Sequence, residues 1–328
     1  MSRTYKTTGI NLKSMPMGES DRLLTILTRE FGLVRAVAMG ARKHNSRLGG
    51  RSEPFVVNEL LIAKGRSLDK ITQAETLESY PGLGQDLKRL IAGQYLAELC
   101  LHQALSDQPQ EDLFCLLNEH LARLERSPGS DVLAHLTHAV FQLLVLAGVA
   151  PQVHLCCVTR EALPPAFGDR NWRIGFSIPA GGTVTLPTLE QLLATQPSRQ
   201  RYKVAEKVVA SPQIEASRTS PSVSAKTSVD SSFSDSALSY KPSPSIAGLH
   251  RRISASELLL LQHLTDATLP ELKGLLASVG VAELSQQTLH QLWRSVEQAL
   301  RSYAQYYLDR PIRSAALIDA CFTTADLA

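Results

Sequence analysis

The strongest constraint on the fold of this chain is a change in the spacing of its apolar residues near residues 80–84. Before that point, short segments rich in apolar and β-branched residues alternate with turn residues, which is the pattern of β-strands. The segments that we predict as strands are 5–13, 22–28, 32–39, 55–64 and 68–77. Because short strands expose their edges unless the sheet closes, residues 1–80 are predicted to form a five-stranded β-barrel of the oligonucleotide-binding (OB) type.

Beyond residue 84, apolar residues recur every three or four positions, which predicts helices. Three such sets lie at 83–95, 113–124 and 133–147, and Gly148 with Pro151 ends the third. A fourth apolar stripe begins near Gln287. Residues 81–195 are therefore predicted to form a helical domain.

Two stretches interrupt the helical pattern. Residues 171–186 suggest a hairpin around Gly181-Gly182. Residues 211–250 are rich in Ser and Pro and cannot bury a core, so we predict a disordered insertion over 196–254.

Helices are expected to resume over 255–328 and to complete the helical domain, with Ser254 or Ser256 capping the first of them. The predicted fold class is α+β multidomain. It combines the N-terminal OB-type barrel with an all-α domain that carries a small irregular hairpin insertion.

Positive charge gathers in the stretch 37–55 between two predicted strands, where no acidic residue occurs between Arg35 and Glu53. Residues 1–80 hold 13 Lys or Arg and 8 Asp or Glu, a balance of 13 − 8 = +5, whereas the whole chain carries only +3. This asymmetry indicates that the N-terminal domain faces a polyanion, although a solvated charged loop is the simpler alternative.

Phosphate neutralisation is the physical role that suits such a loop, since each contact to a nucleic-acid backbone releases a counterion. The residues predicted to bind DNA are Arg35, Arg42, Lys43, Arg47, Arg51, Lys64, Arg66 and Lys70. Aromatic residues are few here, and both Phe31 and Phe55 are expected in the core. We therefore expect tracking of the backbone with little base stacking.

Catalytic motifs are missing from the sequence. It contains no Walker loop, no G-x-S-x-G and no H-E-x-x-H, so we do not expect an enzyme. A metal or hydrolase site built on His135, His138, His154 and Cys156 is a rival interpretation. Adjacent Cys156 and Cys157 chelate poorly and no second pair follows, so we expect core histidines, buried thiols and no cofactor.

Five cysteines, two of them adjacent, do not form a disulfide framework and favour a reducing compartment. The N-terminal segment lacks the apolar core of a signal peptide. The most apolar window, 133–150, contains His135, His138 and Gln142, which indicates a buried helix and not a membrane span. The expected location is the cytoplasm.

Several motifs together resemble the RecO family of DNA repair proteins. They are GESDRLLTILTREFGLVRAVAMGARK (18–43), SRLGGRSEPF (46–55), AELC (97–100) and LRSYAQYYLDRPIRSAALI (300–318). The resemblance covers most of the chain except roughly 196–254. It implies an OB barrel and a helical domain, and it assigns DNA contact to Arg42, Lys43 and Arg47. The other five cations are extensions from charge alone.

The resemblance also implies a role and partners. These are single- and double-stranded DNA, RecR and the C-terminal tail of the single-stranded DNA-binding protein SSB. The implied role is to anneal strands and to help load the RecA recombinase onto SSB-coated DNA. An RNA-binding adaptor and a protein-interaction scaffold remain alternatives.

The sequence departs from the family at a four-cysteine zinc module that many members carry. In this chain the region 151–190 keeps only Cys156 of the first pair, and Thr159 stands where the second cysteine would be. The zinc site is therefore expected to be lost.

Overall fold

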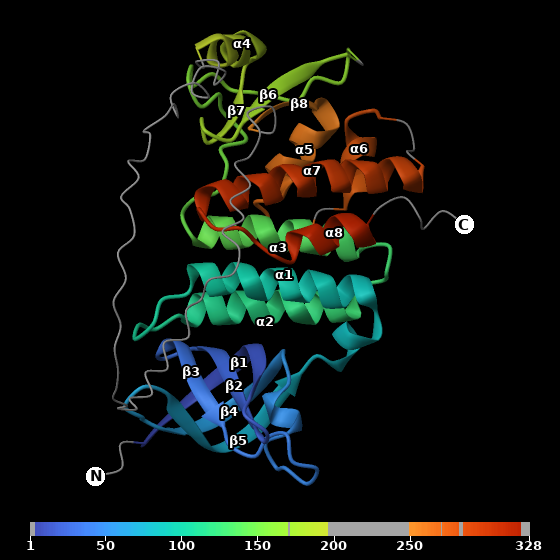
Figure 1. Cartoon of the computed structure of the whole chain (residues 1–328). Helices are drawn as coiled ribbons and strands as arrows, with labels where there is room; N and C mark the ends of the chain where they lie inside the picture. Colours follow the sequence, from blue (N-terminus) through green and yellow to red (C-terminus); the bar gives the residue numbers. More distant parts are fainter. Residues whose placement is uncertain (1–3, 170, 196–248, 270, 282–284, 323–328) are drawn as a thin grey trace, which may run out of the picture.

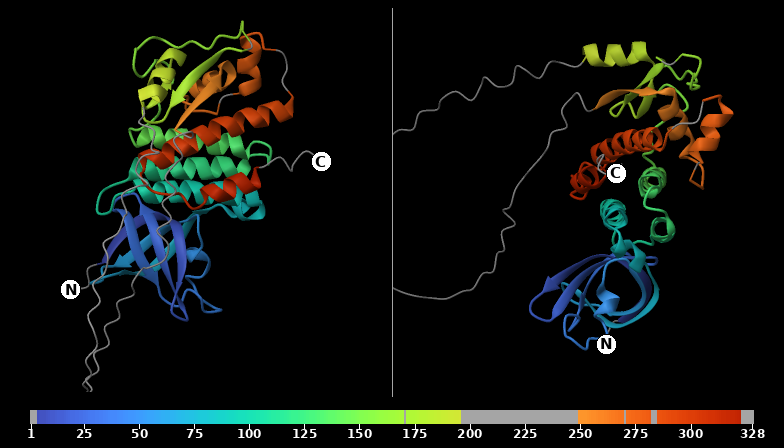
Figure 2. Two further views of the ribbon diagram at one scale, coloured as in Figure 1. Left: turned by 45° about the horizontal axis from the view of Figure 1, so that its top comes forward. Right: turned by 90° about the vertical axis from the view of Figure 1, so that its right-hand side faces the viewer.

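The computed structural model describes residues 4–169, 171–195, 249–269, 271–281 and 285–322. Figure 1 shows the chain as a series of layers, with the barrel at one end, the helices in the middle and a small sheet with one further helix at the other end. The two further views in Figure 2 show the same order of layers.

The N-terminal strands form a closed barrel in the order β1-β2-β3-β5-β4, which confirms the predicted OB-type fold. The strands are β1 (Thr4–Met17), β2 (Asp21–Thr28), β3 (Gly32–Ala38), β4 (Val56–Ala63) and β5 (Asp69–Ser79). The barrel closes where β3 and β5 pair in parallel. Its interior is filled by aliphatic side chains such as Leu24, Ile26, Leu60, Ile62 and Ile71.

Strand β1 is longer than predicted, because it continues past Lys13 to Met17. Residues Thr4–Ile10 pair with β4 and residues Gly9–Met17 pair with β2, so beyond Ile10 the strand pairs with β2 alone. Pro16 has no N–H to donate, but one side of this part of the strand is free, so the missing donor costs little.

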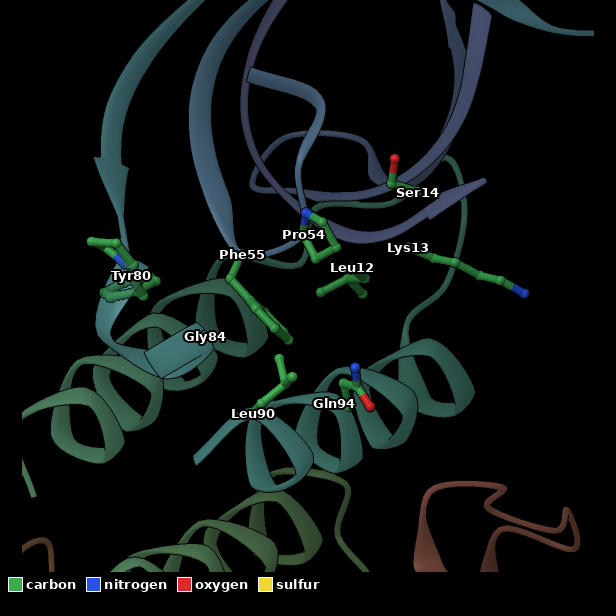
Figure 3. Close-up of a pocket in the computed structure, with 10 residues that line it drawn as sticks. Leu12, Lys13, Ser14, Pro54, Phe55, Tyr80, Gly84, Leu90 and Gln94 are labelled. Atoms are coloured by element: carbon green, nitrogen blue, oxygen red, sulfur yellow. The ribbon is translucent and has the colours of Figure 1, made fainter. Parts of the chain in front are cut away.

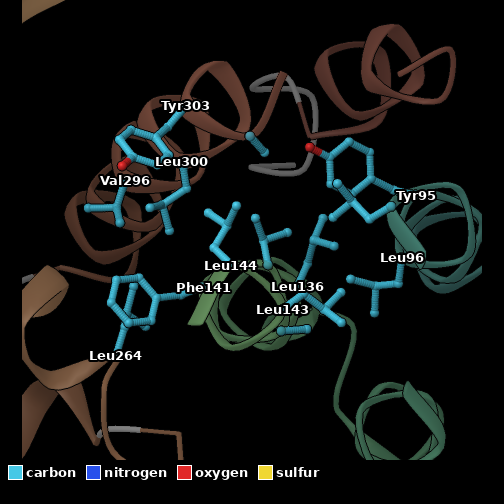
Figure 4. Close-up of a cluster of buried hydrophobic side chains, with 14 of the residues drawn as sticks. Tyr95, Leu96, Leu136, Phe141, Leu143, Leu144, Leu264, Val296, Leu300 and Tyr303 are labelled. Atoms are coloured by element: carbon cyan, nitrogen blue, oxygen red, sulfur yellow. The ribbon is translucent and has the colours of Figure 1, made fainter. Parts of the chain in front are cut away.

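The helical region is built around α3 (Val132–Leu146) and α7 (Gln286–Tyr307). Around them lie α1 (Leu87–Gln103), α2 (Glu111–Arg126), α5 (Ala255–His263), α6 (Leu272–Ser278) and α8 (Ala315–Cys321). Figure 4 shows the apolar side chains of α1, α3 and α7 meeting in one core, among them Leu96, Phe141 and Leu300. Ser254 is the N-cap of α5 and forms a capping box with Glu257, as one of the two predicted caps.

The predicted hairpin is present as β6 (Arg173–Ser177) and β7 (Gly182–Val184). It is extended by β8 (His250–Ser254), so this end of the predicted insertion is ordered and the expectation of disorder is wrong there. The rest of that insertion, 196–248, lies outside the described residues. Helix α4 (Leu186–Thr195) packs against β6.

The barrel and the helices share one hydrophobic core. Ile10, Leu27 and Phe55 of the barrel belong to the same buried cluster as Leu96 and Phe141. Two backbone hydrogen bonds reinforce this contact. The N–H of Leu33 donates to the Leu105 carbonyl oxygen (2.9 Å), and the N–H of Gln110 donates to the Arg29 carbonyl oxygen (2.8 Å). The barrel is therefore held against α1 and α2. No helix in the described part of the chain has the length and apolar character to cross a membrane.

Candidate nucleic-acid interface

The outer face of β1, β2 and β3 is organised in rows that follow the strand register, because paired residues on neighbouring strands point to the same side. Ile10 pairs with Leu27, and Leu27 with Leu33. This first row is apolar and packs into the core shared with the helices. The helices therefore cover only one end of the outer face.

The next rows are not covered by helices. Lys13 pairs with Thr25, and Thr25 with Arg35, which gives a polar row with a cation at each end. Met15 pairs with Leu23, and Leu23 with Val37, which gives an apolar row that Lys70 of β5 continues. Met17 and Asp21 pair at the rim of the barrel, where Met39 directly follows β3.

The basic loop, residues 39–55, connects β3 to β4 and closes one end of the barrel. The loop consists of successive tight turns. For example, the Lys43 N–H donates to the Gly40 carbonyl, and the Ser46 N–H donates to the Lys43 carbonyl. Ala41 and Leu48 of the loop pack on the barrel interior. The loop thus covers one end of the barrel interior, and its charged side chains lie on the outside.

Hydrogen bonds hold this loop in one shape. The buried Asn11 amide donates to the carbonyl oxygens of Arg51 (2.8 Å) and Glu53 (2.9 Å), and the Asn58 amide also donates to Arg51 (2.9 Å). The Arg42 guanidinium donates to the Gly18 carbonyl (2.9 Å), which joins the loop to the β1–β2 turn. The cations are therefore presented from an ordered backbone.

The eight predicted cations lie in two adjoining groups. Arg42, Lys43, Arg47 and Arg51 belong to loop 39–55. Lys64 and Arg66 lie in the β4–β5 loop, next to Lys70 at the start of β5 and Arg35 on β3. The two groups meet where Lys70 pairs with Val37, two residues before the basic loop begins. In OB folds, the face of strands 2 and 3 and the loops β1–β2 and β4–β5 are the places where oligonucleotides bind.

None of the eight cations forms an ion pair with a carboxylate in the described part of the chain. Three other barrel cations do so. Lys6 pairs with Glu59, Arg22 with Glu53 and Arg29 with Glu111. The eight therefore remain available to an anion, although Arg51 is half-buried and turns its guanidinium to the Arg47 carbonyl (3.0 Å).

Asp21 is one of the carboxylates at this surface, with Glu53 in the loop itself and Asp69 beside Lys70. The Asp21 side chain accepts hydrogen bonds from the Gly40 N–H (2.7 Å) and the Ser20 hydroxyl (3.0 Å). These bonds, with a smaller contribution from Lys43, lower the pKa of Asp21. The Asp21 carboxylate thus accepts its hydrogen bonds within the turn that anchors the loop.

Lys13 is a residue of this surface that our sequence reasoning did not find. It follows an irregularity in β1 between Asn11 and Lys13, which turns its side chain to the outer face next to Thr25. An exposed lysine in a predicted strand carries no signal by itself. The pairing with β2 is what places it in line with Arg35.

The aromatic residues depart in part from expectation. Phe55 is buried as predicted, but Phe31 is 36% exposed and not in the core. Its ring contacts that of Tyr5 edge-on, with centroids 4.7 Å apart. Phe31 lies in the β2–β3 turn, where the chain doubles back and too few neighbours surround it to cover the ring.

A cavity of about 420 Å³ lies between the barrel and α1 (Figure 3). Leu12, Phe55 and Leu90 provide apolar walls, and Lys13 and Tyr80 are its titratable residues. Burial and a hydrogen bond to Glu78 raise the pKa of Tyr80. Among the described residues, no carboxylate, histidine or cysteine lines this cavity, so they provide no acid–base pair there.

The residues of the rival metal site do not come together. The His138 ring packs edge-on against His120, with centroids 5.5 Å apart, and its Nε2 lies 2.9 Å from the Asp266 carbonyl oxygen. Cys156 is buried, and its sulfur accepts a hydrogen bond from the Thr159 N–H (3.4 Å). Within the described residues, no group of three or more His, Cys, Asp or Glu is arranged to hold a metal ion.

The Cys156 thiol has an environment shaped by its neighbours. Burial raises its pKa, but hydrogen bonds from Thr159 and from backbone N–H groups of Thr185 and Val158 outweigh burial and lower the pKa to about 7. By its sequence position, Thr159 stands where a second cysteine of a zinc pair would be expected. The chain's own N–H groups thus satisfy the sulfur.

These features define the chain as an OB-fold protein with a cationic outer barrel surface, joined through a shared core to a helical domain. Comparison with known proteins identifies the family. Residues 1–80 match the model described as Recombination protein O N terminal, and residues 84–194 match Recombination protein O C terminal.

Curated relatives named DNA repair protein RecO extend the match over nearly the whole chain. The relative from Nostoc sp. is 51% identical over 325 residues, covering 98% of this chain and 97% of the relative. The relative from Synechococcus elongatus is 38% identical over 330 residues, covering 100% of this chain and 99% of the relative. The chain therefore belongs to the RecO family of DNA repair proteins.

Proposed function

We propose that this protein is a recombination mediator without catalytic chemistry, which binds DNA through the cations of its barrel. The proposal rests on the position of those cations and on their lack of carboxylate partners in the described part of the chain. Lys70 pairs with Val37, two residues before the basic loop begins, and none of the eight predicted cations forms an ion pair with a carboxylate among the described residues.

Annealing follows from this arrangement as a physical effect. Two complementary strands repel each other through their phosphates, and a fixed positive surface reduces that repulsion by replacing mobile counterions. Strands held near such a surface pair faster without any covalent bond being made or broken. Single- and double-stranded DNA are both ligands in this scheme, because each presents phosphates.

The proposed partners extend this role. RecR and the C-terminal tail of SSB are proposed to bind the protein, and the outcome is the loading of RecA onto SSB-coated single strands. Membership of the RecO family supports this part.

Fluorescence anisotropy with a labelled single-stranded oligonucleotide over a salt series tests the DNA contact. Replacing Arg42, Lys43 and Arg47 with Ala should weaken binding and make the slope of log K against log salt shallower by about 2, since each lost phosphate contact on single strands removes roughly 0.7. A matched control removes three exposed cations of the helical region, through Arg126→Ala, Lys273→Ala and Arg313→Ala. Equal losses in both variants would mean that net charge, and not this surface, drives binding.

Strand annealing measured with and without SSB tests the proposed mediator role. Annealing of SSB-coated strands should be faster with the protein than without it, and the Ala triple variant should lose this effect. Competition between matched RNA and DNA oligonucleotides tests the alternative of an RNA-binding adaptor, which predicts a preference for RNA. A pure interaction scaffold predicts no affinity for either.

A further inference from the structure

Exposed methionines gather on the outer face of the barrel. The chain has four methionines, and Met15, Met17 and Met39 all lie at this end of β1 and β3. Their exposed fractions are 37%, 41% and 56%. Together with the half-buried Leu23 they form what we call the apolar strip. Contiguous apolar side chains left open to water mark a binding surface more often than chance exposure.

Cations border the apolar strip on both sides. Lys13 and Arg35 occupy the neighbouring row toward the helices, and Lys70 continues the row of Met15 and Leu23 across the sheet. On the far side, Arg42 is fixed to Gly18, the residue after Met17. Asp21 pairs with Met17 at one end of the strip, but its carboxylate accepts hydrogen bonds from the Gly40 N–H and the Ser20 hydroxyl. The ligand that this surface fits therefore has anionic groups at its margin and apolar groups along the strip.

Single-stranded nucleic acid has this chemistry. Its phosphates are charged, and its unpaired bases present flat apolar faces that a duplex hides by stacking. Methionine suits irregular, changing contacts of this kind, because its flexible thioether side chain is polarisable and packs favourably against rings. Cations follow the strip along its length, which suits the regularly spaced phosphates of a nucleic-acid backbone.

We propose that the apolar strip contacts unpaired bases while the bordering cations hold the backbone, so that this face prefers single strands to duplex. The inference rests on the proposed DNA contact of the barrel, and it adds the reason why that contact prefers single-stranded DNA to duplex DNA. A surface that holds bases unstacked and accessible also keeps a strand ready for pairing.

The test compares affinities for a single-stranded oligonucleotide and for a duplex of the same length, by anisotropy with the full chain. Replacing Met15, Met17 and Met39 with Gln keeps side-chain length but removes apolar character. Binding of the single strand should weaken by about tenfold and that of the duplex by less than about twofold. The corresponding triple Leu variant should restore single-strand binding. Leu77→Gln, at an exposed leucine of β5 outside these rows, should change neither affinity.

Two outcomes would overturn the inference. The first is a Gln triple variant with unchanged single-strand affinity, and the second is one that loses affinity for both ligands equally. A variant with Arg35→Ala and Lys70→Ala should weaken both ligands together. If this variant binds both as tightly as the parent, the proposed DNA contact itself fails, which separates the two failures.

Discussion

Asn11 is wholly buried, and its amide nitrogen donates to the carbonyl oxygens of Arg51 and Glu53. Asn58 also serves the Arg51 carbonyl, but the Glu53 carbonyl depends on Asn11. Asn11→Ala should lower the free energy of unfolding by about 1–3 kcal/mol, because the buried amide is lost and the part-buried Glu53 carbonyl loses its donor. It should also weaken DNA binding, since the basic loop is held less firmly.

The salt series distinguishes this effect from lost charge. All cations remain in Asn11→Ala, so the salt slope of DNA binding should match that of the parent protein. Asn45→Ala, at an exposed asparagine of the same loop, is the control and should change neither quantity. A shallower slope in Asn11→Ala would contradict the anchoring role.

His120 makes stability depend on pH. Burial, followed by the nearby charges of His138 and Arg123, lowers its pKa to about 3. In the unfolded chain His120 takes up a proton near pH 6.5, whereas in the folded protein it stays neutral down to about pH 3. The contribution of His120 to the free energy of unfolding is therefore full above pH 6.5 and falls as the pH drops below it. This group alone should cost about 2 kcal/mol between pH 7 and pH 5.

Urea denaturation of His120→Phe at pH 7, 6 and 5 measures this share. The variant keeps an aromatic ring against His138, so it should fold, and its stability should fall less on acidification than that of the parent. His102, His135, His138 and His250 also have lowered pKa values and contribute to the remainder. Identical losses in parent and variant would exclude His120 as the source.

At the scale of residues, the sequence predicted what depends on local composition. The charge of the basic loop is visible in the sequence because its residues are consecutive. The roles of Asn11 and Lys13 are not, because they depend on β1 pairing with β2 and on a loop forty residues away. Phe31 was misplaced since hydrophobicity does not reveal how many neighbours surround a turn.

At the scale of elements, α8 is held by buried charges. Arg301 of α7 donates to both Asp319 oxygens (2.8 and 2.6 Å) and to the Ala315 carbonyl (2.9 Å). Its guanidinium lies 2.9 Å from Glu297, yet burial still raises the pKa of that carboxyl to about 7. Glu98 of α1 accepts from Arg313 and Ser314 at the start of α8.

Arg301→Met should therefore lower the free energy of unfolding by about 3–5 kcal/mol, because it leaves Glu297 without its cation and releases α8. Thermal or urea unfolding measures the loss. Arg252→Met is the matched control. It breaks the exposed pair with Glu190 and should cost no more than about 0.5 kcal/mol. Comparable losses in the two variants would mean that burial of the Arg301 network contributes nothing.

Periodicity predicted the long elements well: α2 and α7 bury one face, while α1 and α3 are buried on most sides. It failed for α8 and β8, which are only 7 and 5 residues long. Elements this short are fixed by what they pack against, α8 by Arg301 and Glu98, and β8 by pairing with β6. These contacts lie far apart in the sequence.

At the scale of the whole molecule, the barrel and the helices are expected to unfold as one cooperative unit, because the row Ile10–Leu27–Leu33 packs into the core that they share. Gly32 lies at the closest approach. It adopts a left-handed conformation with φ of 64°, and a Cβ added there would lie 2.0 Å from the Leu105 carbonyl oxygen. That oxygen accepts the Leu33 N–H across the junction.

Gly32→Ala should therefore do more than strain one turn. The left-handed conformation costs an alanine about 1–2 kcal/mol, and the clash with fixed backbone should add about 1–3 kcal/mol. Gly18→Ala isolates the first contribution, because Gly18 has φ of 59° and nothing within 4 Å of the added methyl group. Both tryptophans, Trp172 and Trp293, lie outside the barrel, so their fluorescence reports the helical region, while hydrogen exchange reports barrel amides. Since one core joins the two parts, Gly32→Ala should lower the free energy of unfolding by the same amount whether it is measured by fluorescence or by hydrogen exchange. A loss confined to the barrel amides would show that the two parts unfold separately.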